Sequence, residues 1–343
     1  MKLSWKPFTL EFKHPFRIAH GTRSTTPVVF TRIEHEGYTG YGEASMPPYL
    51  GESHASVIGF LQKLKLESFA GTFDPSAIMH YVDEVEEGNT AAKASVDIAL
   101  HDLWGKMQGK PLYELLGADP NHTPYTSFTI GMDDTAMILQ KLEEASDYPL
   151  LKVKLGGEHD MQILDTIRSV CSRSLSVDIN QGWNDREEAL DRIYRMKEMN
   201  VSFVEQPFAK NRFNDHAWLK ERSPLPVFAD ESCQRLKDIA ACASSFDGIN
   251  IKLMKCTGLA EAREMIKEAR KQGLKILIGC MSESSCAVSA AAALTPFANY
   301  ADLDGPLLIK NNVFSGVEFI AGKICLPLLP GSGAVLKEPV FGM

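Results

Sequence analysis

The chain has 343 residues, 44% of them hydrophobic and 9% aromatic, which favours two globular domains, or one large barrel with an appendage, and excludes disordered and fibrous folds. Its 36 Lys and Arg stand against 44 Asp and Glu, so the formal net charge is −8. An acidic chain is repelled by phosphate backbones and by anionic lipid, so we expect neither nucleic acid nor a membrane as a partner.

The expected compartment is a reducing cytoplasm. Residues 1–7 contain no apolar signal core, and no stretch of the chain approaches the roughly 18 apolar residues of a membrane helix. The seven cysteines are odd in number and contain no C-x-x-C pair, which argues against a disulfide framework and against a zinc site.

The amino-terminal part of the chain predicts an α+β unit. Alternating apolar and polar residues up to about residue 60 indicate an antiparallel sheet. Segment 16–26, which carries His20 and Arg23, is too polar for a core strand and is predicted as a loop that touches a ligand. Residues 53–117 then show small and apolar residues at the three- and four-residue spacing of helices.

After Pro124 the pattern changes to a repeat of short apolar strand, polar loop and amphipathic helix. The expected strands cover residues 125–130, 150–155, 175–179, 201–205, 227–230, 248–252, 275–279 and 300–303. Eight strands with helix-sized gaps predict an α/β fold, a (β/α)7β-type TIM barrel. A doubly wound open sheet is the alternative, but its glycine fingerprint is missing after the first strand.

We therefore predict two domains. Residues 1–120 would form an α+β capping domain, joined by the Pro- and Gly-rich tail of about residues 318–343. Residues 121–317 would form the barrel, which we expect to carry catalysis because barrel active sites collect at the carboxyl ends of the strands.

Three acids stand at the ends of three successive predicted strands, namely Asp178, Glu205 and Asp230. At a shared barrel mouth they would repel one another unless a cation neutralised them. Oxygen ligands without His or Cys suit Mg²⁺ or Mn²⁺, so we predict that these acids bind one Mg²⁺. Any one of them alone could be a solvated loop carboxylate, and only their matching positions favour a site.

Three lysines complete the predicted mouth. Lys152 and Lys154 are two apart on one strand and so face the same way, and Lys252 ends a strand on the other side. Burial and nearby positive charge would depress a lysine pKa and make a neutral amine available as a base. For Lys152 alone, a stem lying along the rim with its head in water is the alternative.

Together these groups suggest proton transfer next to a carboxylate. The metal would chelate a substrate carboxylate and stabilise the enediolate formed when the α-proton leaves. A lysine on each face of that planar intermediate permits removal on one side and return on the other, which inverts the α-carbon. A single base would instead suit elimination or retention.

The chain resembles the enolase superfamily, in the muconate-lactonising subgroup. The resemblance rests on Lys-x-Lys at residues 152–154, on Lys252, and on the helical segments 97–106 and 111–117. It implies that Asp178, Glu205 and Asp230 bind Mg²⁺, that Lys154 and Lys252 are the acid/base pair, and that Lys152 assists electrostatically. The mandelate-racemase subgroup would show a histidine base near the seventh strand, and residues 278–283 have none.

The end of the eighth strand resembles the dipeptide epimerases within that subgroup. There an Asp-x-Asp pair, here Asp302 and Asp304, receives the α-ammonium group of the substrate. A turn-forming Asp-Gly-Pro explains Asp304 about as well. The resemblance places specificity in segment 16–26 and at the seventh strand, so we predict Arg23, Met281 and Ser282 as further substrate-binding residues.

The resemblance also bears on the preferred dipeptide. In the Ala-Glu epimerases, an arginine of the first loop contacts the glutamate side chain. By an ungapped count Gly21 stands at that place and Arg23 lies two residues further on. We therefore expect an Ala-containing dipeptide with a small second residue, such as Ala-Ala.

The predicted activity is that of an isomerase, a Mg²⁺-dependent dipeptide epimerase acting on the C-terminal residue. Within the same scaffold, a cycloisomerase or dehydratase of the muconate-lactonising or o-succinylbenzoate synthase type is the alternative reaction. A catalytically silent barrel that binds amino acids or peptides is the alternative from another class. The expected partner is a small dipeptide, and a homo-oligomer is an open alternative to a monomer.

Overall fold

The computed structural model describes residues 1–343 except 20, 70, 72, 342 and 343. The chain begins with an antiparallel sheet of β1 (Lys2–Ile18), β2 (Gly21–His35) and β3 (Tyr38–Ser45). Its helices are α1 (His54–Leu61), α2 (Pro75–Glu84), α3 (Thr90–Gln108) and α4 (Leu112–Leu115). Short 3₁₀ turns lie at Pro48–Leu50, Leu66–Phe69 and Pro120–His122. The predicted α+β composition of this part is confirmed.

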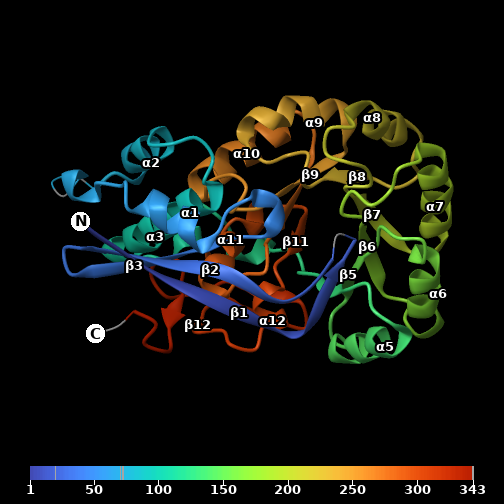
Figure 1. The fold of residues 1–343 in the computed structure, drawn as a ribbon, viewed down its shortest axis with the longest axis horizontal. Coiled ribbons are helices and arrows are strands. Elements are labelled where there is room, and N and C mark those ends of the chain that lie inside the picture. The colour runs from blue at the N-terminus through green and yellow to red at the C-terminus, as the bar shows by residue number, and fades with distance from the viewer. Residues whose placement is uncertain (20, 70, 72, 342–343) are drawn as a thin grey trace.

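The prediction of a loop over segment 16–26 was wrong. Apart from His20, which lies outside the described residues, the segment belongs to a long hairpin in which Phe16 pairs with Arg23 and Ile18 with Gly21. Its polar side chains misled the interpretation, because a two-stranded ribbon needs only paired backbones and tolerates polar residues on exposed faces. The hairpin extends toward the barrel beside β5 and β6 (Figure 1), and Met132 N donates to Arg17 O at 3.2 Å.

Helix α3 lies directly on the backbone of β3. The helix is buried along most of its length, which explains why its apolar residues are not confined to one stripe. Gly40 and Gly42 make this approach possible, since a Cβ at Gly42 would lie 1.9 Å from Ser95 O, and one at Gly40 would lie 2.1 Å from Ala99 O. Close packing therefore fixes the helix against the sheet.

The second part is a closed barrel of parallel strands, as predicted. Its strands, all fully described, are β4 (Phe128–Ile130), β5 (Leu150–Lys154), β6 (Ser174–Asp178), β7 (Val201–Glu205), β8 (Val227–Ala229), β9 (Gly248–Ile251), β10 (Lys275–Gly279) and β11 (Tyr300–Asp302). They pair in chain order from β4 to β11. A bridge between Thr126 and Ala301 joins the first strand region to the last and excludes the open doubly wound sheet.

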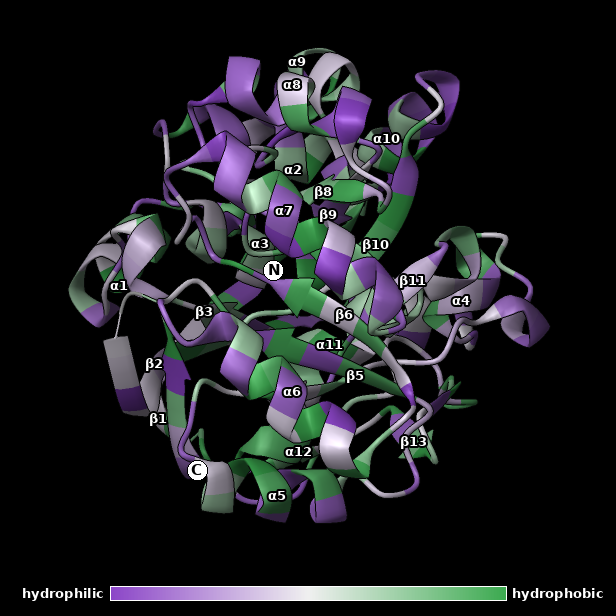
Figure 2. Cartoon of the chain, turned by 90° about the vertical axis from the view of Figure 1, so that its right-hand side faces the viewer, coloured by the Kyte–Doolittle hydropathy of each residue, from purple (hydrophilic) through white to green (hydrophobic). Residues whose placement is uncertain are grey.

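Helices connect consecutive strands and cover the barrel from outside. They are α5 (Thr135–Glu144), α6 (Asp160–Val170), α7 (Arg186–Glu198), α8 (Phe213–Arg222), α9 (Ile239–Ser245), α10 (Leu259–Lys271) and α11 (Ser285–Ala292), with 3₁₀ turns at Leu236–Asp238 and Thr295–Phe297. Figure 2 shows the hydrophobic strands β9 and β10 behind helices, such as α7, whose visible turns are largely hydrophilic. No helix in the described part of the chain is both long and apolar enough to cross a membrane.

After β11 the chain returns to the amino-terminal sheet. This part contains α12 (Gly305–Leu308), β12 (Phe314–Ser315), β13 (Glu318–Ile320), β14 (Lys323–Cys325) and β15 (Val335–Leu336). The Phe314 ring lies 5.1 Å from the Phe30 ring, and buried Asp102 Oδ1 accepts hydrogen bonds of 2.9 Å from Ser332 N and Oγ. The domain boundary near residue 120 stays a prediction.

An aromatic layer fills the barrel beneath its carboxyl end. Phe203, Phe228 and Tyr300 contact one another there, with ring centroids 4.6 to 5.6 Å apart. Each stands two residues before an acid at the end of the same strand, so each points into the barrel one layer below that acid. Aromatic side chains therefore lie directly beneath Glu205, Asp230 and Asp302.

We expect Gly42→Ala to destabilise the chain by about 3 kcal/mol or more, because the added methyl group meets the α3 backbone rather than a flexible side chain. Gly59→Ala is the matched control, since Gly59 lies in α1 with nothing within 4 Å of its added Cβ. That change should be neutral or stabilise by up to about 1 kcal/mol. Chemical denaturation measures both, and equal stability of the two variants would contradict the close-packing assignment.

Candidate active site

Three acids meet at the carboxyl end of the barrel. Asp178 and Glu205 are the last residues of β6 and β7, and Asp230 follows β8 by one residue. One carboxylate oxygen of each lies within 4.8 Å of the others, and the residues are only 0%, 0% and 1% exposed. A buried set of oxygen donors from three strands fits a hard divalent cation such as Mg²⁺. The structure thus brings the predicted metal ligands together.

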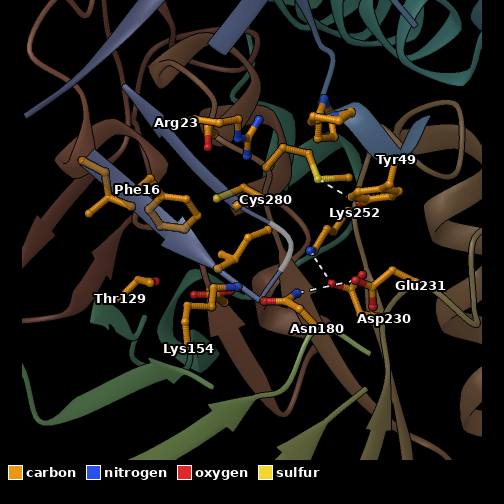
Figure 3. A pocket seen from close by; sticks show the side chains of 18 of the residues that line it. Phe16, Arg23, Tyr49, Thr129, Lys154, Asn180, Asp230, Glu231, Lys252 and Cys280 are labelled. Carbon is orange, nitrogen blue, oxygen red and sulfur yellow. Dashed lines mark hydrogen bonds and ion pairs between the residues drawn. The ribbon is translucent and has the colours of Figure 1, made fainter. Parts of the chain in front are cut away.

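Lys154 and Lys252 lie on opposite sides of this group. Lys154 Nζ donates to Asp178 Oδ2 at 2.7 Å, and Lys252 Nζ donates to Asp230 Oδ2 at 2.6 Å. Figure 3 shows Lys252 beside Asp230, and Lys154 apart from them in the same pocket. Lys154 ends β5, and Lys252 directly follows β9, four strands further around a barrel of eight. That spacing places the two strands across the barrel from each other, so the amines approach its centre from opposite walls.

Lys152 lies deeper and is 1% exposed. Its Nζ is 2.7 Å from Asp302 Oδ2, 2.8 Å from Glu205 Oε2 and 3.2 Å from Asp178 Oδ2. The alternative of a lysine with its head in water was therefore wrong. The side chain joins the metal-ligand group to the end of β11.

The pKa values of the buried lysines differ from the expectation. Burial lowers the pKa of Lys252, but Asp230 and then Tyr49 raise it, and the balance lies well above the usual value. The pKa of Lys152 is likewise raised, by Asp302 and Glu205 against burial. The predicted depression depends on a cation among the acids, whereas with the carboxylates alone as nearest charged neighbours the pKa of both lysines is raised.

The surroundings shift the pKa values of two of the acids in opposite directions. Burial raises the pKa of Asp178, but the charges of Lys154 and Lys152 lower it to about 2. Burial and then the Asp178 charge raise the pKa of Glu205 to about 7, against Lys152. Glu205 is therefore the acid whose negative charge is stabilised least by the groups around it.

Asp302 and Asp304 lie at the end of β11, with side chains in the same pocket. Asp302 Oδ1 accepts from Ser127 Oγ at 2.8 Å, and Asp304 Oδ2 accepts from Thr129 N at 2.6 Å. Burial and then the Asp302 charge raise the pKa of Asp304 to about 7. Asp304 precedes α12 but makes no side-chain capping bond to it, so the turn alone does not account for this carboxyl.

The pocket has a volume of about 260 Å³. Its lining includes the predicted residues Arg23, Lys154, Asp230, Lys252, Met281, Ser282, Asp302 and Asp304. Asp178, Glu205 and Lys152 are buried at its base. Cys280 and Met281 belong to the pocket wall.

Arg23 enters the pocket from the β1–β2 hairpin (Figure 3). Its Nη1 is buried and has no hydrogen-bond partner among the described residues. Burial lowers the pKa of its guanidinium group. An unpaired buried donor with a positive charge is a site for an anion.

Tyr49 is a pocket residue that the sequence reasoning missed. Its ring is 41% exposed, and its hydroxyl donates to Met281 Sδ at 3.2 Å. Burial raises the pKa of this hydroxyl well above its usual value, against the charge of Lys252. Nothing in the sequence signals this position, because it lies in a 3₁₀ turn far from the barrel strands in the chain.

Glu43 and Ser45 of β3 hold the segment after β10 and were also missed. Glu43 Oε2 accepts from Ser284 Oγ at 2.6 Å and from Ala287 N at 3.2 Å, and Ser45 Oγ donates to Ser282 O at 2.8 Å. Burial raises the pKa of Glu43 to about 7, against the hydrogen bonds from Ser284. The amino-terminal sheet thereby sets the position of segment 280–284, of which residues 280–282 line the pocket.

Comparisons with known proteins agree with this architecture. Residues 7–117 match the model of the mandelate racemase/muconate lactonizing enzyme N-terminal domain, and residues 135–340 match the enolase C-terminal domain-like model. The chain is 51% identical to an L-Ala-D/L-Glu epimerase of Bacteroides thetaiotaomicron, over 98% of this chain and 88% of that protein. It is 38% identical to an L-Ala-D/L-amino acid epimerase of Maribacter, over 98% of this chain and 100% of that protein.

A solved structure shows the same fold with ligands. The dipeptide epimerase of Cytophaga hutchinsonii, complexed with Mg and the dipeptide D-Ala-L-Val, matches with a TM-score of 0.92 and 26% identity, over 98% of this chain and 95% of that one. The resemblance drawn from the Lys-x-Lys and strand-end residues is confirmed. The chain therefore belongs to the mandelate racemase/muconate lactonizing enzyme family of the enolase superfamily.

Proposed function

We propose that this protein is a Mg²⁺-dependent dipeptide epimerase that inverts the α-carbon of the C-terminal residue by 1,1-proton transfer. The observation that carries the proposal is the placement of Lys154 and Lys252 on opposite walls of one pocket, with a buried acidic group between them. The names of the similar proteins, which are epimerases of Ala-containing and other dipeptides, support the same reaction.

The proposed roles follow from where each group lies. Asp178, Glu205 and Asp230 would hold Mg²⁺, whose positive charge stabilises the enediolate form of a substrate carboxylate. One lysine removes the α-proton from one face, and the opposite lysine, carrying its own proton, returns one to the other face. Lys152 holds a positive charge beside the acidic group and keeps Asp302 oriented.

The substrate's two ends would be bound across the pocket. Among the described residues, neither Asp302 nor Asp304 has an arginine partner, although Asp302 pairs with Lys152. Both lie on the β11 side of the barrel, away from Asp230. They would receive the α-ammonium group, while the carboxylate end lies at the metal. A pocket of about 260 Å³ closed at both ends by charge selects a short zwitterion.

The side chain of the second residue is proposed to be acidic, as in Ala-Glu, in place of the small residue expected from the sequence. The ungapped count compared positions along the chain alone, whereas the hairpin places the Arg23 side chain in the pocket. The buried, unpaired Nη1 of Arg23 supports a carboxylate as its partner.

The alternatives explain less of the site. A cycloisomerase or dehydratase needs one base, which leaves the second opposed lysine without a role. A catalytically silent binding barrel gives no role to the three acids, whose negative charges repel one another. We also propose a reducing compartment, the cytoplasm, since the seven cysteines are free thiols.

Replacement of either lysine by methionine should lower epimerisation by more than about 1,000-fold, because inversion needs a proton acceptor on one face and a proton donor on the other. In deuterated water, Lys154→Met should still exchange the α-proton of one epimer of Ala-Glu, and Lys252→Met that of the other. Proton NMR follows both. Exchange of the same epimer by both variants would contradict the opposed-base assignment.

Glu205→Gln should separate metal binding from folding. Gln has nearly the same shape and removes one negative charge from the acidic group, so the stability of the variant is compared with and without metal, which separates loss of a ligand from a change in folding. Mg²⁺ at 100 times its Kd should stabilise the native protein by about 2.7 kcal/mol and the variant by far less. Thermal denaturation with Mg²⁺ and with EDTA measures this, and an equal Mg²⁺ response would remove Glu205 from the ligand set.

Arg23→Met should lower kcat/KM for Ala-Glu by about 100-fold, since the substrate carboxylate would lose its charged partner, and should change Ala-Ala by less than about threefold. Arg17→Met is the matched control, because Arg17 lies on the same hairpin but is exposed and bonds Thr22 Oγ1. Steady-state kinetics on both dipeptides decide the matter. An equal loss on Ala-Ala would refute an acidic-residue subsite.

A further inference from the structure

Asn250 contacts the acidic group from beneath. It lies on β9 two residues before Lys252, so both side chains point to the barrel interior. The residue is 0% exposed, and its Nδ2 donates to Glu205 Oε1 at 2.7 Å. This bond joins strands β7 and β9, which are not neighbours in the sheet.

Glu205 accepts fewer hydrogen bonds from the described residues than the other two acids do, so it depends more on this single bond. Asp178 accepts from Lys154 Nζ and from Asn180 N, and Asp230 accepts from Lys252 Nζ and from Lys255 Nζ. The described residues give Glu205 one hydrogen bond, from Asn250, and an ion pair of 2.8 Å between Oε2 and Lys152 Nζ. Asn250 is therefore the neutral group that sets which way the Glu205 carboxylate faces.

The surroundings hold Asn250 in one place. Lys255 Nζ donates to Asn250 O at 2.8 Å and to Asp230 O at 2.7 Å, which ties the β9 backbone to the end of β8. Gly279 of β10 leaves room for the amide, because a Cβ there would lie 2.4 Å from Asn250 Oδ1. A flipped amide would turn its oxygen toward the Glu205 carboxylate, which repulsion disfavours.

We infer that Asn250 is a positioning residue for the metal site: by holding Glu205 Oε1 it fixes the orientation of the carboxylate that would help to hold Mg²⁺. The inference rests on the proposed function only in assigning Glu205 to Mg²⁺. Replacing Lys255 would be less informative. The loss of its positive charge would itself strengthen cation binding and so mask any loss of carboxylate orientation. Replacing Asn250 changes no charge.

The test is the Mg²⁺ affinity of the Asn250→Leu protein, measured by titration calorimetry without dipeptide. Leucine has a similar volume and cannot donate, so the Kd for Mg²⁺ should rise 10- to 100-fold. Thr295→Val is the matched control, because it also removes one buried hydrogen bond, of 2.7 Å to Ala292 O, but at the amino end of the barrel. Its Mg²⁺ Kd should match that of the native protein even though its thermal midpoint falls.

Each outcome is informative. A Kd for the Asn250→Leu protein within twofold of the native value would overturn the inference, whether or not any dipeptide is epimerised. If the native protein binds Mg²⁺ but epimerises no dipeptide, the proposed function is overturned. The comparison of Kd values then still tests the inference about Asn250. Should the leucine variant not fold, Asn250→Ser, whose hydroxyl is too short to reach Glu205 Oε1, gives the same comparison.

Discussion

The repulsion between three buried carboxylates is the constraint on which the site depends. Ligand oxygens within 4.8 Å of one another repel by about 3 kcal/mol per pair at an effective dielectric near 20. Summed over the three pairs, that is comparable to the whole free energy of unfolding of an ordinary domain. The barrel can bring the acids together only because lysines, amide donors and a divalent cation compensate their charge, and every functional feature described above is part of that compensation.

The two-residue period of the strands turns this constraint into layers. The rings of Phe203, Phe228 and Tyr300 fill the lower layer, and Glu205, Asp230 and Asp302 stand above them on the same strands. Apolar surroundings strengthen each charge interaction above this layer. The β1–β2 hairpin, with Arg23, and the 3₁₀ turn Pro48–Leu50, with Tyr49, then line the pocket from the other side.

Most of the barrel and the acidic group could be predicted from the sequence because both depend on local, periodic signals. Each predicted strand overlaps an observed strand, and the acids that end them do meet. The hairpin over segment 16–26 could not be predicted, because its pairing partner and not its own composition makes it a strand. Tyr49, Glu43 and Asn250 were missed for a related reason, since their roles depend on contacts with residues 45 to 241 positions away in the chain. The raised pKa values of Lys152 and Lys252 were not predicted, because the direction of a pKa shift depends on which charged group is nearest. The spacing of residues along the sequence does not give that information.

The return of the tail to Asp102 has a consequence for synthesis on the ribosome. Asp102 Oδ1 accepts from Ser332, which is translated 230 residues later. Until then α3 lacks these two donors, although Tyr41 N and Lys106 Nζ can already donate to Asp102 Oδ2. The amino-terminal sheet should therefore reach its final stability only after residue 332 has emerged from the ribosome.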